Sequence, residues 1–124
     1  MTLPPLGYAF GALEPHVDAM TMEIHHDKHH AAYVNGANAI LDKNPELAKK
    51  SVVEILSNLG AVPEASRAAL RNNLGGHYNH TLFWELMAPG GAKEPAGDLK
   101  SAIDGAFGSL DKLKEAVNDA GMKR

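Results

Sequence analysis

The segment from Met22 to Tyr33 most constrains how this chain can fold, because four of its seven histidines fall within positions 25 to 30. On an α-helix, His25 and His29 would lie one turn apart, and His29 would lie one turn before Tyr33. One helix face would then present two imidazoles and a phenol in a row. Such a row can bind a transition metal and move protons to it, or it can be a polar stripe that faces solvent. The local pattern leaves both readings open.

Apolar residues recur at helical spacing around this segment and again in the second half of the chain. Asp18 can cap a helix that runs to about Leu41. Pro63 suits the first turn of a second long helix, which Pro89 would end. No run alternates with the two-residue period of a strand. The sequence therefore predicts an all-α chain: a long antiparallel helical hairpin plus short helices.

Two local signals refine this prediction. Ser51 and Glu54 have the spacing of a capping box, so we expect a short helix between the long ones, ending at Gly60. The pair Gly75-Gly76 lies inside the second long helix, where each glycine costs about 0.5–1 kcal/mol relative to alanine. We expect close approach of a partner helix or a bulky side chain to offset this cost, the alternative being a break that splits the helix.

The Gly- and Pro-rich stretch after the second long helix predicts a division of the chain. Residues 1–88 would form the hairpin domain, 89–97 a linker, and 98–124 one or two smaller helices. Within the last segment Asp98 can cap one helix, Gly108 would interrupt it, and Ser109 can cap the next.

Composition excludes several classes of function. The formal charge of −3 makes nucleic acid an unexpected partner. No apolar run approaches the roughly 20 residues of a membrane span, and the N-terminus lacks a basic-then-apolar leader, so we expect a cytoplasmic protein that is not in a membrane. Because the chain has no cysteine, any bound metal must be held by histidine nitrogen and carboxylate oxygen.

The two predicted long helices would bring His25 and His80 face to face across their seam. Two histidines alone are a weak site, since a catalytic metal usually takes at least three protein ligands. Nothing in the spacing selects a third ligand among the available carboxylates, which are those of Glu23, Asp27 and Glu85. We expect structural or surface roles for the remaining imidazoles considered at this point, which are those of His16, His26 and His30.

Several segments of the sequence resemble the N-terminal part of the iron/manganese superoxide dismutases. The matching segments are 3–9, 12–16, 21–35 and 70–84, with Gly97-Asp98-Leu99 and Phe107-Gly108-Ser109 further along. The cluster His25-His26-Asp27-Lys28-His29-His30 and the run Asn79-His80-Thr81-Leu82-Phe83-Trp84 are specific in combination. The resemblance extends over essentially the whole chain.

The resemblance implies a metal with three histidine ligands, one aspartate ligand and a bound solvent, in which His25 and His80 match two of the histidines. It implies that His29 and Tyr33 match the histidine and tyrosine of the family's substrate funnel, and that Trp84 matches its aromatic wall. Typical iron members have glutamine where this chain has Gly76. Gly76-His77 therefore looks like the manganese type, with iron as the alternative.

The same resemblance implies dismutation of superoxide by a redox-cycling manganese or iron, one per complete subunit, in a homo-oligomer that is a dimer in the complete enzyme. Family chains continue into an α/β domain whose Asp-x-Trp-Glu-His-Ala-Tyr segment supplies the other two ligands. This sequence stops at Arg124, so we expect the 124-residue chain alone to be weakly active or inactive. A fragment, a part of a longer protein and a true short form all remain open.

Two other functions also remain open at this point. A helical module could bind zinc, nickel or copper through His25, His29 and His80 without redox chemistry. Alternatively, a structural hairpin could associate with itself through an uncovered patch around Trp84.

Overall fold

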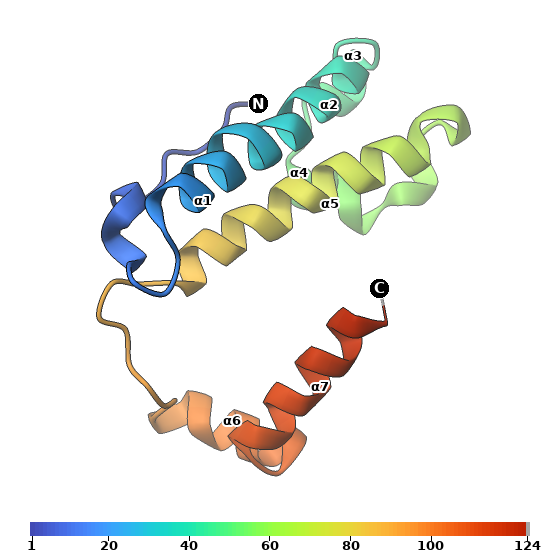
Figure 1. Ribbon diagram of the computed structural model, residues 1–124. Helices are drawn as coiled ribbons and strands as arrows, with labels where there is room; N and C mark the ends of the chain where they lie inside the picture. Colours follow the sequence, from blue (N-terminus) through green and yellow to red (C-terminus); the bar gives the residue numbers. More distant parts are fainter. Residues whose placement is uncertain (124) are drawn as a thin grey trace. The chain divides into compact units, whose positions relative to one another are not determined.

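The computed structural model describes residues 1–123 and consists of helices joined by short connections (Figure 1). Arg124, the last residue of the predicted segment 98–124, lies outside the described residues. The described part contains no strand, which confirms the all-α prediction. It divides into two compact units, Met1–Pro89 and the residues from Gly90 onward.

Within residues 1–123, none of the helices combines the length and the apolar character that crossing a bilayer requires.

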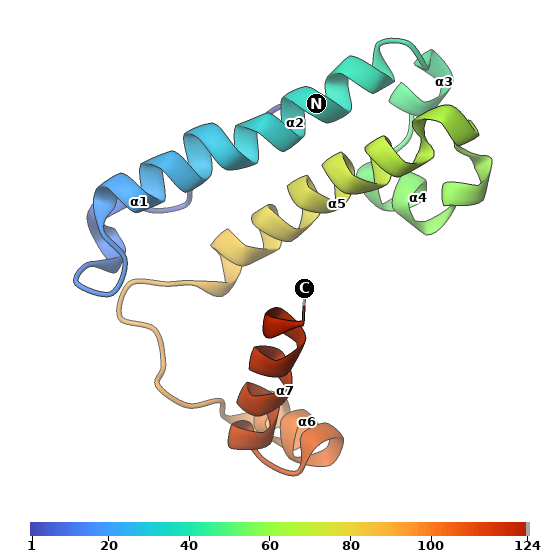
Figure 2. The same cartoon turned by 45° about the vertical axis from the view of Figure 1, so that its right-hand side comes forward.

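The first unit is an antiparallel helical hairpin (Figures 1 and 2). Its first arm runs without interruption through α1 (Ala19–Ile24), a π-helical turn η2 (His25–His30) and α2 (Ala31–Leu41). Asp18 caps it as predicted, its Oδ1 accepting a hydrogen bond from the Thr21 N–H at 2.9 Å. The second arm is α5 (Glu64–Leu86), which packs along α2.

Short elements connect the two arms: α3 (Pro45–Ala48), α4 (Val52–Ser57) and a 3-10 turn, η3 (Leu59–Ala61). The predicted capping box is present, because Ser51 Oγ accepts from the Glu54 N–H and Glu54 Oε2 accepts from the Ser51 N–H. The predicted end at Gly60 is wrong. The α-helix stops at Ser57, and Gly60 belongs to the tighter turn that follows.

The glycine pair of α5 does not split the helix, which continues from Glu64 to Leu86. A Cβ at Gly76 would stand 2.4 Å from Cδ1 of Tyr33, so the missing side chain makes room for that ring. A Cβ at Gly75 would meet nothing within 4 Å. The expected close approach by a bulky neighbour is thus found, at one glycine of the two.

The first unit has an apolar end and a histidine end. Around the connecting helices, seven buried residues form one hydrophobic cluster: Ala37, Leu41, Leu47, Ile55, Val62, Leu70 and Leu74. The opposite end contains the histidine-rich turn, the second half of α5 and the N-terminal arm with its 3-10 turn η1 (Phe10–Leu13). The arm is fastened there by the Tyr8 hydroxyl, which donates to the Trp84 carbonyl at 3.1 Å.

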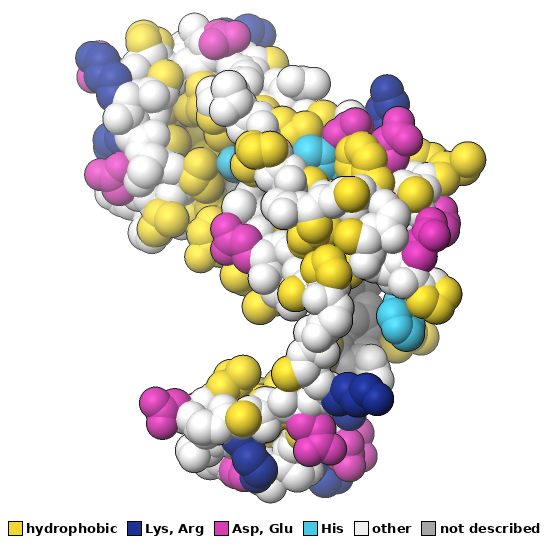
Figure 3. Space-filling model, turned by 90° about the vertical axis from the view of Figure 1, so that its left-hand side faces the viewer, with side chains coloured by type: hydrophobic (Ala, Val, Ile, Leu, Met, Phe, Trp, Pro, Cys, Tyr) yellow, Lys and Arg dark blue, Asp and Glu magenta, His cyan; other side chains and the backbone are white. Residues whose placement is uncertain are grey.

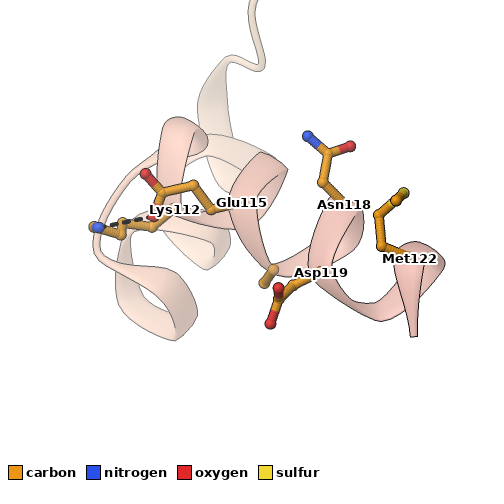
Figure 4. Close-up of a pocket in the computed structure, with 6 residues that line it drawn as sticks. Lys112, Glu115, Asn118, Asp119 and Met122 are labelled. Atoms are coloured by element: carbon orange, nitrogen blue, oxygen red, sulfur yellow. Dashed lines mark hydrogen bonds and ion pairs between the residues drawn. The ribbon is translucent and has the colours of Figure 1, made fainter.

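The second unit contains α6 (Gly97–Phe107) and α7 (Leu110–Met122). Gly108 ends α6 in the left-handed conformation, with φ of 86°, and Ser109 caps α7, both as predicted. Asp98 does not cap α6: it lies in the first turn, and Ala96 precedes the helix without a side-chain cap. Along α7, a shallow hollow is lined by side chains of this one helix, including Lys112 paired with Glu115 (Figure 4).

Candidate metal centre

The predicted meeting of His25 and His80 is found at the seam of the hairpin. Their Nε2 atoms lie 3.0 Å apart, and both side chains are half-buried. His80 Nδ1 lies 2.8 Å from the Gly76 carbonyl oxygen, which can only accept, so Nδ1 carries a proton. A neutral His80 therefore directs its Nε2 lone pair at His25, whose own Nε2–H donates to it.

This pair fits two ligands of one metal ion. Two imidazole nitrogens that share a metal at about 2.1 Å each, with an angle of about 90–110° between them, lie about 3.0–3.4 Å apart. The separation of 3.0 Å falls within that range. The bond from His80 Nδ1 to a backbone carbonyl is the kind of outer contact that orients a ligating histidine.

Among the described residues, no carboxylate completes the pair. Within residues 1–123, no group of three or more His, Cys, Asp or Glu side chains is placed to hold a metal ion. Of the three carboxylates considered from the sequence, Asp27 is engaged elsewhere, its Oδ1 lying 2.6 Å from His26 Nδ1. The described part of the chain therefore offers two ligands.

The π-helical turn places alternate histidines in different surroundings. His26 and His30 are buried, at 5% and 0% exposure, whereas His25 is half-buried and His29 is exposed. Single π-turns inside α-helices are rare overall, and those that occur are often found at functional sites. The sequence pattern assumed regular α-helix and did not predict this turn.

His30 is the centre of a buried hydrogen-bond chain. Its Nδ1 accepts from the Trp84 indole N–H at 3.0 Å, and its Nε2 lies 2.7 Å from His77 Nδ1. Because an indole is only a donor, His30 Nδ1 carries no proton, and its Nε2–H donates to His77. His30 thus joins Trp84 to His77 by hydrogen bonds. Trp84 also packs against His25, with ring centroids 4.9 Å apart.

His26 fastens the N-terminal arm to the same turn. Its Nε2 lies 2.9 Å from the carbonyl oxygen of Pro4, and its Nδ1 faces the Asp27 carboxylate. Both partners are acceptors, so the imidazole satisfies both only when both of its nitrogens carry protons. His26 therefore has a structural role, as predicted.

The two residues matched to a substrate funnel lie beside the pair. The His29 ring packs edge-on against His25 with centroids 5.9 Å apart, and the Tyr33 ring lies 5.2 Å from that of His80. A hollow of about 260 Å³ opens at the pair, lined by His25, Asn79, His80 and Phe83. On one face of the first unit, imidazole reaches the surface among hydrophobic side chains (Figure 3).

Burial lowers the pKa of three imidazoles at this end of the hairpin, those of His25, His30 and His77. It lowers the pKa of His30 to about 4, with His77 and His80 adding electrostatic repulsion. It also lowers the pKa of His25, and the facing His80 and His29 contribute to that shift. The pKa of His77 is lowered in the same way, by burial first. Neutral imidazole is the form that binds metals.

Comparisons with known proteins show the family of the chain. Residues 1–88 match the family described as "Iron/manganese superoxide dismutases, alpha-hairpin domain". The chain belongs to the iron/manganese superoxide dismutase family. It is 57% identical over 122 residues to "Superoxide dismutase [Mn]" of Thermus aquaticus, an alignment that covers 98% of this chain and 60% of that protein.

Two further relatives of this superoxide dismutase family member differ in their named metal. "Superoxide dismutase [Mn] 1" of Leptolyngbya boryana is 52% identical over 98% of this chain and 49% of its own length. "Superoxide dismutase [Mn/Fe]" of Methylomonas sp. is 50% identical over 99% of this chain and 60% of its own length. The chain thus spans about half to three fifths of these relatives.

Proposed function

We propose that this chain is the helical part of a manganese-type superoxide dismutase, in which His25 and His80 are two of the metal's ligands. The observation that carries the proposal is the Nε2-to-Nε2 separation of 3.0 Å between these two histidines, in a chain of this family. The substrate would be superoxide, and the overall reaction 2 O₂⁻ + 2 H⁺ → O₂ + H₂O₂. Iron is the alternative metal, as in the Mn/Fe relative.

Manganese, when bound, would supply reversible one-electron oxidation and reduction. The residues of this chain would hold it and manage protons. His80 would offer its Nε2 lone pair, and His25 would offer its own once the Nε2 proton has moved to Nδ1 or to solvent. Trp84 would exclude water from one side. Tyr33 Oη and the exposed His29 ring would carry protons between solvent and the reacting oxygen. His77 and Gly76 would act behind the pair, by accepting from His30 and by making room for Tyr33.

Several predictions from the sequence remain part of the proposal. These are the domain assignment of residues 1–88, 89–97 and 98–124, the cytoplasmic location and the dimer. The other two ligands would come from the part of the family's fold that this sequence does not contain. Under this proposal the 124-residue chain alone is a weak catalyst or none.

The proposal is tested first on the protein purified from its natural host, measured for intact mass, metal content and superoxide dismutation. Two variants of that protein and the 124-residue chain alone are then assayed for dismutation. We expect near-stoichiometric manganese or iron, a mass above 13.2 kDa, and activity that His80→Ala removes while the exposed control His16→Ala retains it. Tight zinc without dismutation would favour the non-catalytic metal-binding module. Family-level turnover by the 124-residue chain alone would contradict the division of ligands.

A further inference from the structure

Three side chains, those of Trp84, His30 and His77, form a hydrogen-bonded network directly behind the histidine pair, and the proposed chemistry gives its central member, His30, no role of its own. The network crosses the hairpin, since His30 belongs to the first arm and the other two residues belong to α5. His30 is completely buried, and Trp84 is 5% exposed. Both ring nitrogens of His30 are satisfied, and no buried side-chain nitrogen or oxygen among the described residues lacks a partner.

Two rings of this network pack against the two proposed ligands. The His30 ring stacks on His80 with centroids 5.3 Å apart and planes 26° apart. The Trp84 ring meets His25 nearly at a right angle, at 76°. Each proposed ligand therefore packs against one ring of the network. The hydrogen bond between Trp84 and His30 fixes the orientation of both of these rings.

We propose that His30 is a positioning residue for the pair His25 and His80. Its hydrogen bond with Trp84 holds the indole ring against His25, and its own ring is held against His80. This inference rests on the proposed function for the identity of the ligands. The hydrogen bonds of this network run in one direction: the indole N–H donates to His30 Nδ1, and His30 Nε2–H donates to His77 Nδ1. A residue that merely filled the space would not require this direction.

Two substitutions separate the two hydrogen bonds of His30. His30→Asn places a carbonyl oxygen near the position of Nδ1, so it can accept from Trp84 but does not reach His77. His30→Gln reaches the position of Nε2 and can donate to His77, but it leaves the indole N–H without its acceptor. His30→Phe keeps the ring and removes both bonds, and the exposed His16→Gln is the matched control.

The first readout is NMR of the whole chain without metal. Trp84 is the only tryptophan, so the indole N–H signal needs no further assignment. We expect ring ¹⁵N shifts that report a proton on Nε2 and none on Nδ1 for His30, and an indole signal that moves in H30Q and H30F but stays near its place in H30N. A different tautomer of His30 in the wild-type chain would overturn the proposal even if every variant failed to fold.

The second readout is titration with Co²⁺ alone, followed by its visible absorption. Loss of outer contacts to a metal site typically weakens metal affinity by about 10- to 100-fold. We expect a loss near the upper end for H30F, smaller losses for H30N and H30Q, and none for H16Q. Unchanged affinity in a folded H30F would refute the positioning role. If the two histidines of the 124-residue chain bind no Co²⁺ by themselves, the NMR pattern alone decides the role of His30. The proposed function is decided separately, by the metal content of the protein purified from its natural host.

Discussion

The two ends of the hairpin are built from the same two helices but are held together by different forces. At the apolar end, seven buried side chains form a cluster that is stabilised by the hydrophobic effect. This effect grows with the apolar area removed from water and has no preferred direction. At the histidine end, buried imidazoles and an indole are joined by hydrogen bonds of defined direction. Buried polar networks of this kind specify one arrangement when every member is satisfied.

This division between the two ends explains how such a chain can carry a reactive site. The apolar end fixes how α2 and α5 lie along each other, and the histidine end uses that alignment to bring residues 25 and 80 together. Substitutions at the apolar end should therefore change stability most. Substitutions at the histidine end should change metal affinity more than stability.

Leu70→Ala should have the largest effect, because Leu70 is 0% exposed within the apolar cluster. Truncating a buried leucine costs about 2–5 kcal/mol of unfolding free energy. Urea denaturation followed by circular dichroism would measure it, with the exposed Val53→Ala as the control at roughly 0.5 kcal/mol or less. A cost for L70A as small as that of V53A would mean that this cluster does not hold the hairpin.

The glycine pair of α5 offers a matched comparison at the histidine end. Gly76→Ala would place a methyl group 2.4 Å from Tyr33 Cδ1, and overpacking of this kind costs about 1–3 kcal/mol. Gly75→Ala meets nothing within 4 Å and should stabilise the helix by about 0.5–1 kcal/mol. Thermal unfolding of both variants would show the sign. Equal shifts would contradict the close contact between α5 and Tyr33.

Ser51→Ala tests the cap of α4, which joins the arms at the apolar end. It removes the acceptor of the Glu54 N–H and should cost about 1 kcal/mol. Ser51→Asp, which keeps an acceptor at this position, should recover most of the loss. If urea denaturation gives S51A the stability of the unaltered chain, the capping box contributes nothing to the hairpin.

The smallest expected effect is the pH dependence of the caps. Hydrogen bonds from Thr21 lower the pKa of Asp18, and hydrogen bonds from Ser51 lower the pKa of Glu54. Folded carboxylates that bind protons less readily than unfolded ones stabilise the fold above their ordinary pKa values, and this stability is lost as the pH falls through the lowered values. The contribution of these two caps should therefore be lost below about pH 5, so that in this range urea midpoints should fall less steeply in Asp18→Asn with Glu54→Gln. An identical decline in that double variant would assign the effect to other groups.

Much of the fold follows from local signals in the sequence. Asp18, the Ser51–Glu54 box and Gly108 act on their own chain neighbours, so their roles are visible without the structure. The facing of His25 and His80 then follows from two helices with apolar seams. The predicted close approach is confirmed at Gly76 and is not found at Gly75, and the sequence did not name the neighbour, Tyr33.

The rest depends on geometry that the sequence pattern does not contain. The π-turn changes how residues 25 to 30 are distributed around the helix, whereas the pattern assumed regular spacing. The partner that gives His30 its role, Trp84, lies 54 positions away and was expected only as a wall. The end of α4 was misplaced because Gly60 can end an α-helix or belong to a 3-10 turn, and the residues around it do not decide which.

The most direct test of the central claim is the effect of Mn²⁺ on the histidine ring signals of the ¹⁵N-labelled chain. Bound Mn²⁺ broadens the resonances of nearby nuclei, so even weak binding identifies the ligands. The ring signals of His25 and His80 should broaden first, those of His29 and His30 next, and that of the exposed His16 last. Broadening that begins at His16, or that spreads evenly over all seven histidines, would contradict a metal centre at the seam of the hairpin.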